Sequence, residues 1–328
     1  MAEVALLSNP RSTGNRELLP RVRSFCARHP EIFHYEVDEV DQIGEALKTI
    51  ALVRPKVLVI NGGDGTVQAA LTELYHGGHF GETVPPVAVL PNGKTNLIAL
   101  DLGARGDPLE ALQRVLDIAR SGVASHVVPR ELIAVSDGGT NSRPVLGMFL
   151  GGAGLADSIL FCRHKIYPLG LPNSLSHVLT VLALIATAIF GARASFLPGR
   201  PRPVSVSVHH QGELKGRFVL LMVTTLERLL LNTRTRDGQT IGVDPAGALK
   251  LMAIEERPST VFRALLAAIG GRLGRSHLHG VHFERGDEIR IEGDRSSVIL
   301  DGELFETSEG RPIVLTPTAP VPFLSLAA

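Results

Sequence analysis

Three glycines and one aspartate stand together in NGGDGT (residues 61–66), between the apolar run VLVI and the helical pattern VQAALTEL. Glycine lets the chain turn sharply and lets backbone N–H groups approach a ligand without an intervening Cβ. The first N–H groups of the following helix are natural partners for phosphate. Asp64 would repel phosphate, so its position favours Mg²⁺ or a water bound to Mg²⁺. The alternative is a tight turn in which Asp64 only caps the helix.

A second glycine-containing loop, PNGKTN (residues 91–96), also precedes a helical pattern. Its Gly93-Lys94-Thr95 run imitates the end of the G-x-x-x-x-G-K-[ST] phosphate loop. The first glycine of that motif would fall on Ala88, inside the strand-like run VAVL, which excludes a loop of that type. The loop either faces phosphate beside the first one or is an ordinary connection between a strand and a helix.

Two carboxylates flank a glycine in Asp301-Gly302-Glu303, directly after the strand-like run SSVIL. Carboxylates at a strand end could take a proton from a hydroxyl, as the catalytic carboxylate of phosphoryl transfer does. An Asp-Gly pair is also a common turn of a β-hairpin. The pattern alone leaves both interpretations open.

The elements that must position these residues alternate between strand and helix over the first 125 residues. The expected strands cover 4–7, 32–37, 56–60 and 87–90, and the expected helices cover 17–27, 43–52, 67–75 and 107–119. Such alternation predicts a doubly wound parallel sheet with helices on both faces. Ligands of these sheets bind beyond the carboxyl ends of the strands, which is where both glycine-containing loops fall.

From about residue 127 short strand-like runs dominate, interrupted by helical patterns at 175–192 and 260–269. At roughly 100–200 residues per domain, a chain of 328 residues is long enough for two domains. We therefore predict an α/β nucleotide-binding domain over 1–126 and a β-rich, antiparallel, sandwich-like substrate domain over 127–328. The C-terminal segment could pack back on the first domain.

Composition narrows the classes of protein further. Lys plus Arg and Asp plus Glu both total 33, and this zero net charge argues against a nucleic-acid partner. Cys26 and Cys162 are too few for a disulfide framework, which fits a reducing compartment. A signal peptide would have a basic region followed by an apolar run, and the N-terminus does not show this pattern. We expect a cytoplasmic protein.

The apolar segment 175–192 has no Asp, Glu, Lys or Arg. It is slightly shorter than the roughly 20 residues of a spanning helix and contains polar residues, so a buried or interfacial helix is favoured over a membrane span. Basic residues flank it, which makes it a candidate for peripheral contact with the inner membrane face: Arg163, Lys165, Arg193, Arg200 and Arg202.

The GGDGT, PNGKTN and Asp-Gly-Glu elements, with Asn9-Pro10 and Gly14 after the first strand, together resemble the diacylglycerol kinase catalytic-domain family of lipid kinases. That family is similar in fold to the NAD kinases, and the resemblance covers essentially the whole chain. It implies a nucleotide-binding α/β domain before a β-rich domain, with the site in the cleft between them. It also implies ATP and Mg²⁺ as cofactors and a lipid alcohol such as diacylglycerol, met at a membrane surface, as substrate.

The resemblance also implies roles for single residues. Asp64 would be linked to Mg²⁺, Glu303 would be the general base that deprotonates the lipid hydroxyl, and Asp301 would support it. The residues implied to bind the nucleotide are Asn9, Gly62, Gly63, Asp64, Gly65, Thr66, Gly93, Thr95 and Asn96.

The chain departs from the family pattern after the GGDGT turn, where Gln68 and Ala69 replace a frequent Asn-Glu pair, and in the second loop at Lys94 and Leu97. We find no clear match for a second Mg²⁺ site. Two alternatives therefore stay open: an NAD kinase-like phosphotransferase acting on a soluble dinucleotide, and a nucleotide- or lipid-binding protein without catalysis.

Overall fold

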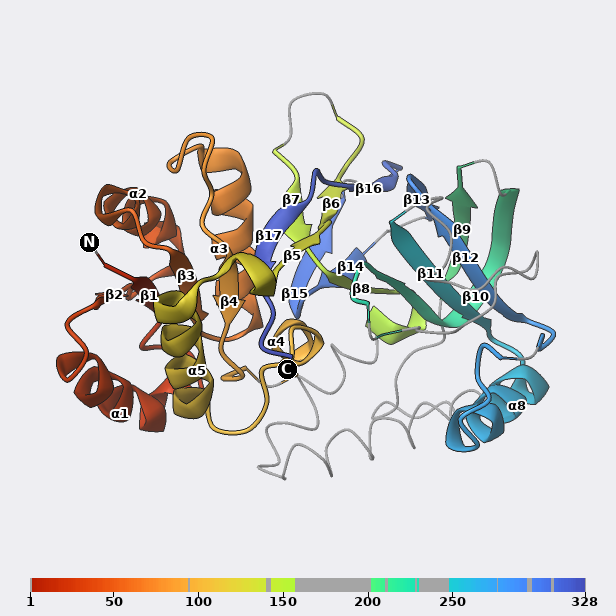
Figure 1. The fold of residues 1–328 in the computed structure, drawn as a ribbon. Helices are drawn as coiled ribbons and strands as arrows, with labels where there is room; N and C mark the ends of the chain where they lie inside the picture. The colour runs from red at the N-terminus through yellow and green to blue at the C-terminus, as the bar shows by residue number, and fades with distance from the viewer. Residues whose placement is uncertain are drawn as a thin grey trace. The chain divides into compact units, whose positions relative to one another are not determined.

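A computed structural model of the chain divides into two compact units. The first comprises Met1–Leu132, Val145–Gly147 and Thr318–Ala328, and the second comprises Ile133–Pro144 and Met148–Pro317 (Figure 1). The residues that the structure describes are 2–93, 95–139, 143–156, 202–209, 212–227, 229, 248–275, 277–293, 297–307 and 310–327.

The first unit contains a six-stranded sheet in the order β2-β1-β3-β4-β17-β5. Its strands are β1 (Val4–Ser8), β2 (Ile32–Glu36), β3 (Val57–Asn61), β4 (Val87–Val89), β5 (Val127–Arg130) and β17 (Val321–Leu324). Neighbouring strands from β2 to β17 are parallel, and β5 runs antiparallel to β17. All residues of β1 and β3 are buried, as expected for central strands of a sheet covered on both faces.

Helices cover both faces of this sheet (Figure 1). Two of them, α1 (Asn15–Ala27) and α5 (Pro108–Ser121), contact each other, and so do α2 (Ile43–Val53) and α3 (Asp64–Gly77). The short helix α4 (Leu97–Asp101) follows β4, and single 3-10 turns occur at η1 (Val40–Gln42) and η2 (Ala124–His126). The predicted doubly wound α/β architecture is confirmed. Each predicted helix and strand of the first 125 residues is present, with ends that differ by up to three residues.

The second unit is built on antiparallel strands in the order β15-β14-β8-β10-β9-β13-β16-β6, with β11 paired to β10 and β12 paired to β11. The bounds are β6 (Ile133–Ser136), β8 (Phe149–Gly152), β9 (Pro203–Val208), β10 (Gly212–Thr224), β11 (Leu249–Glu255), β12 (Val281–Gly286), β13 (Ile289–Glu292), β14 (Ser297–Leu300), β15 (Glu303–Glu306) and β16 (Ile313–Pro317). One helix, α8 (Pro258–Ile269), packs on β11. The predicted antiparallel, β-rich second domain is confirmed.

Several short strands carry no clear pattern in the sequence. These are β5, β7 (Val145–Gly147), β8, β12, β15, β16 and β17. Strands of three to six residues that contain Gly, Pro or charged residues give little alternation, and their partners in the sheet decide whether they form. Strand length alone did not decide which strands the sequence revealed, because β4 with three residues was predicted and β12 with six was not.

The apolar segment 175–192 lies outside the described residues, as do Arg163, Lys165, Arg193 and Arg200. Within the described ranges, no helix is both long enough and apolar enough to cross a membrane.

Candidate active site

Three loops of the first unit meet at the carboxyl edge of its parallel sheet. Asn9 follows β1, the GGDGT turn follows β3, and the loop over residues 91–96 follows β4. Ser8 pairs with Asn61 in the register of β1 and β3, so the first two loops start level with each other. Ligands of open α/β sheets bind at this edge.

The GGDGT turn is shaped by close packing at its first glycine. A Cβ on Gly62 would lie 2.6 Å from the Cβ of Thr66, so a larger residue would displace that side chain. Gly63 is the N-cap of α3, and a Cβ there would meet nothing within 4 Å. The first N–H groups of a helix have no partner inside it. Open space beside Gly63 therefore leaves room for an anion next to these donors.

Asp64 is the first residue of α3, and its carboxylate points to the neighbouring loop. Its Oδ2 accepts a hydrogen bond of 2.9 Å from the hydroxyl of Thr95. Burial raises the pKa of Asp64, and the hydrogen bonds from Thr95 oppose this in part. The alternative that Asp64 caps the helix is wrong, because Gly63 is the N-cap and α3 has no side-chain cap. The carboxylate is instead half-buried and open to further interaction.

The second loop takes its shape from Gly93 and Asn96. The N–H of Gly93 donates to Oδ1 of Asn96 at 2.6 Å. Asn96 has a φ of 53°, a left-handed conformation that asparagine adopts more readily than most residues. This turn exposes Thr95 and directs its hydroxyl to Asp64. Lys94 lies outside the described residues.

Four buried asparagines tie the three loops together, and we call Asn9, Asn15, Asn61 and Asn92 the asparagine cluster. Asn92 Nδ2 donates to Oδ1 of Asn15 at 2.6 Å and to Oδ1 of Asn61 at 2.8 Å. Asn15 Nδ2 donates to the carbonyl of Asn9 at 2.7 Å. Asn9 Nδ2 in turn donates to the hydroxyl of Thr66 at 3.0 Å. Hydrogen bonds of buried side chains therefore link all three loops to the start of α3.

Sequence reasoning identified Asn9 and missed the structural role of Asn15, Asn61 and Asn92. A signal was present for Asn61 and Asn92, because an asparagine stands at or just after the end of each of three strands, β1, β3 and β4. Gly14 is part of the same packing: a Cβ there would lie 2.0 Å from Oδ1 of Asn92. The glycine is required by this close approach and not by its backbone, whose φ of −70° suits any residue.

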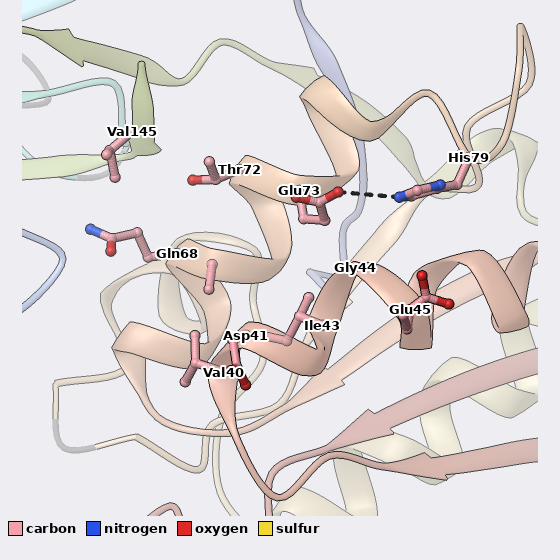
Figure 2. Close-up of a pocket in the computed structure, with 11 residues that line it drawn as sticks. Val40, Asp41, Ile43, Gly44, Glu45, Gln68, Thr72, Glu73, His79 and Val145 are labelled. Atoms are coloured by element: carbon pink, nitrogen blue, oxygen red, sulfur yellow. Dashed lines mark hydrogen bonds and ion pairs between the residues drawn. The ribbon is translucent and has the colours of Figure 1, made fainter. Parts of the chain in front are cut away.

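A cavity of about 550 Å³ lies beside α3 in the first unit (Figure 2). Its lining includes the side chain of Gln68, one turn after Asp64, and no residue of the GGDGT turn itself. It is lined by Val40, Asp41, Ile43, Gly44, Glu45, Gln68, Ala69, Thr72, Glu73, His79 and Val145. Three of these are carboxylates, so the cavity favours hydroxyl or amino groups over phosphate.

Two of the four departures from the family pattern lie at this cavity. Gln68 and Ala69 both line it. The family's frequent carboxylate is missing at Ala69, and Glu73 lies one turn further on the same helix face. Glu73 Oε1 lies 3.2 Å from Nε2 of His79, as the dashed line in Figure 2 shows. A carboxylate is therefore present on this face of α3, displaced by one turn.

The Asp-Gly-Glu element lies in the second unit, in the hairpin of β14 and β15. Asp301 and Gly302 have φ values of 45° and 92°, as in the two-residue turns that join antiparallel strands. The two carboxylate oxygens of Asp301 accept 2.9 Å hydrogen bonds from the N–H groups of Met148 and Phe149. Asp301 is therefore buried and holds the turn against β8. Glu303 begins β15 and is exposed.

The structure thus brings together the predicted residues of the first unit: Asn9, Gly62, Gly63, Asp64, Gly65, Thr66, Gly93, Thr95 and Asn96. Within the second unit, Asp301 and Glu303 lie on one hairpin with different surroundings. Asp301 is bound to backbone amides, and Glu303 has the exposure that a base acting on a substrate needs.

Comparison with known proteins extends these observations. Residues 3–125 match the family model described as the diacylglycerol kinase catalytic domain. No curated protein matches the chain significantly.

Several solved structures from Bacillus anthracis str. Sterne have the same fold. A diacylglycerol kinase is 18% identical, with 96% of this chain and 94% of that chain covered and a TM-score of 0.56. Another protein, provisionally assigned as a diacylglycerol kinase, is 20% identical over 97% of this chain and 94% of that chain, with a TM-score of 0.61. Residues 3–125 are therefore similar to the diacylglycerol kinase catalytic domain, and the solved structures show that the whole chain shares the fold.

Proposed function

We propose that this protein is an ATP- and Mg²⁺-dependent lipid kinase that phosphorylates the hydroxyl of diacylglycerol or a related lipid alcohol. The observation that carries the proposal is the hydrogen bond from Thr95 to Asp64, which joins both glycine-containing loops at the N-terminus of α3. A helix N-terminus, glycine-lined space and a carboxylate are the parts that bind phosphates together with a divalent cation. The match of residues 3–125 to the kinase family supports a lipid alcohol as acceptor.

The residues present fit Mg²⁺. Asp64 is half-buried, burial raises its pKa, and a cation would stabilise the ionised carboxylate. Among the described residues no three His, Cys, Asp or Glu gather into an all-protein metal site. That is compatible with Mg²⁺, which proteins usually hold through one or two carboxylates plus water and substrate phosphates. When bound, Mg²⁺ would offset the charge of the phosphate oxygens.

The chain's own residues would then do two things. The first N–H groups of α3, with Gly63 and Thr95 beside them, would bind and orient the phosphates of ATP. Glu303 would accept the proton of the lipid hydroxyl while the hydroxyl oxygen bonds to the γ-phosphorus. The bond from that phosphorus to the β–γ bridging oxygen breaks, and ADP leaves. Asp301 would position Glu303 by fixing the hairpin that carries it.

The membrane contact that a lipid substrate requires is part of the same proposal. A peripheral protein on the cytoplasmic face would have both ATP and lipid available. The segment 175–192 stays a prediction for this contact, since it lies outside the described residues.

The test is transfer of label from γ-labelled ATP, with Mg²⁺, to a panel of lipids in mixed micelles. Diacylglycerol, monoacylglycerol and a sphingoid base are compared, and NAD without lipid serves as a separate acceptor. We expect label in one lipid and its loss in Asp64→Asn and Glu303→Gln. Glu306→Gln is the matched control, because Glu306 is exposed on the same strand as Glu303.

Each other outcome identifies a different function. Label in NAD without lipid would show an NAD kinase-like phosphotransferase. ATP binding with no transfer to any acceptor would show a binding protein without catalysis. Full activity of Glu303→Gln would leave the lipid kinase in place and exclude Glu303 as its base.

A further inference from the structure

One helix of the second unit exposes an apolar stripe to solvent. Phe262, Leu266 and Ile269 of α8 are 52%, 53% and 76% exposed. Their spacing of four and three residues puts them on one face of the helix. Thr260 and Ala264 are buried on the opposite face. We call these three exposed residues the α8 stripe.

Within the described part of the second unit, the buried face of α8 packs into a hydrophobic core cluster, and the α8 stripe is not part of that cluster. Ala264 belongs to a core cluster with Met222, Met252, Ile254, Val281 and Phe283. The helix therefore packs on β11 through its buried face, and the α8 stripe is exposed on the opposite face.

The stripe is unusual among the described residues. Every other large apolar side chain that is exposed stands alone on its element: Val40, Leu52, Tyr75, Leu100 and Leu304. Single exposed apolar residues are normal, whereas grouped ones mark interaction surfaces. The three grouped residues on α8 thus indicate an interaction surface.

Charge indicates what kind of partner. The run from Pro258 to Phe283 contains Arg263, Arg272 and Arg275 and no Asp or Glu. All three arginines are exposed, and within the described residues none of them forms an ion pair. Arg263 lies beside the stripe, and the other two follow the end of the helix. Exposed apolar residues bordered by unpaired arginines complement a surface that is apolar inside and anionic outside, which describes a bilayer with anionic lipids.

We propose that α8 docks the protein on an anionic membrane surface, with the α8 stripe in the acyl boundary and the three arginines at the headgroups. The proposal rests on the proposed lipid kinase function, which gives the protein a reason to bind a membrane. The helix also lies on the sheet that carries Glu303, since β11 is joined through β10, β8 and β14 to β15. Four strand spacings of about 4.8 Å separate β11 from β15, roughly 19 Å.

The chain contains no tryptophan, which makes a direct test possible. Leu266→Trp would place the protein's sole tryptophan in the stripe. Leu52→Trp is the matched control, because Leu52 is 81% exposed on α2 of the other unit. Both are mixed, without ATP, with vesicles of phosphatidylcholine alone or with phosphatidylglycerol. We expect a blue shift and quenching by brominated acyl chains only for Leu266→Trp and only with the anionic lipid.

Two triple variants separate the two contributions. Replacing Phe262, Leu266 and Ile269 by Ser should weaken vesicle binding about 100-fold, at roughly fivefold per side chain. Replacing Arg263, Arg272 and Arg275 by Glu should weaken it by a similar factor or more, and only on anionic vesicles. Both should keep the wild-type melting temperature, since all six side chains are exposed. Both should also keep the wild-type turnover of a short-chain, water-soluble lipid alcohol.

Three results would overturn the proposal. Wild-type protein could fail to bind anionic vesicles, or the Ser triple variant could bind them as well as wild type does. A dimer that dissociates in the Ser variant, with unchanged vesicle binding, would show that the stripe contacts a second copy. Because vesicle binding needs no ATP, these results are distinct from failure of the kinase assay, which tests the proposed function.

Discussion

The substitution Gly14→Ala tests the asparagine cluster by adding one methyl group. The new Cβ would lie 2.0 Å from Oδ1 of Asn92 and 2.3 Å from its carbonyl oxygen. Carbon and oxygen cannot approach so closely, so Asn92 must move. The backbone at Gly14 is helical, with φ −70° and ψ −27°, so alanine adds no strain of its own. The effect of the variant therefore comes from displacement of Asn92.

The magnitude follows from the hydrogen bonds that Asn92 makes. Moving it removes the donor to Oδ1 of Asn15 and of Asn61, both of which are buried. A buried acceptor left without a partner costs about 1–3 kcal/mol. Alanine regains roughly 0.4–1 kcal/mol by restricting the unfolded chain. With two such acceptors, we therefore expect the free energy of unfolding to fall by about 1–5 kcal/mol.

Urea unfolding followed by far-UV circular dichroism measures this loss. Amide hydrogen exchange in residues 9–15 and 61–66 should rise in the same variant, because the cluster links these loops. Gly63→Ser is the control: its Cβ would meet nothing within 4 Å, and serine is a good N-cap. If Gly14→Ala stays within about 0.5 kcal/mol of wild type and of this control, the cluster does not hold the loops as argued.

Three further predictions concern single titratable groups. Burial raises the pKa of Asp64 in the folded state, so keeping this carboxylate ionised at a pH above its unfolded pKa of 3.8 lowers the stability of the fold. Asp64→Asn should therefore melt at a higher temperature than wild type at pH 7. An equal or lower melting temperature would contradict this. That gain should vanish as the pH falls below 3.8. Asp301→Ala should lower the free energy of unfolding, measured by urea denaturation, by about 2–4 kcal/mol, because two backbone amides lose a charged acceptor. Glu303 is exposed, so Glu303→Gln should change the same quantity by under about 0.5 kcal/mol. Burial raises the pKa of the Cys26 thiol to about 11 from 9.0. In a Cys162→Ser background, iodoacetamide at pH 8 should therefore alkylate Cys26 about 100-fold more slowly than an ordinary thiol. A rate close to that of free cysteine would refute the burial argument.

Local patterns identified the regular elements that position the site. The runs VALL and VLVI are continuously apolar, and β1 and β3 form there because both faces of a parallel sheet are buried. The glycines of the GGDGT turn and the helical pattern after it act over a few residues. Such short-range preferences can be read without knowing the fold.

The partner of each polar group was decided by contacts between distant residues. Asp64 could have capped α3, and the structure pairs it with Thr95, which is 31 residues away. The asparagine cluster joins Asn15 to Asn92 across 77 residues. Periodicity contains no information on such pairs, because they depend on which strands become neighbours.

The sequence by itself determined that this protein has an α/β domain with two glycine-containing loops at strand ends, followed by a β-rich domain. It also named the Asp-Gly-Glu element, and the family resemblance implied that Glu303 is the base and Asp301 its support. Only the tertiary structure decided the surroundings of the two carboxylates: β8 lies beside the hairpin and supplies two amides to Asp301, while Glu303 stays exposed. Likewise, the sequence predicted a helix over 260–269, and only the structure shows that Phe262, Leu266 and Ile269 are exposed on it. They are exposed because, among the described residues, α8 packs on the sheet of β10, β11 and β12 through its opposite face.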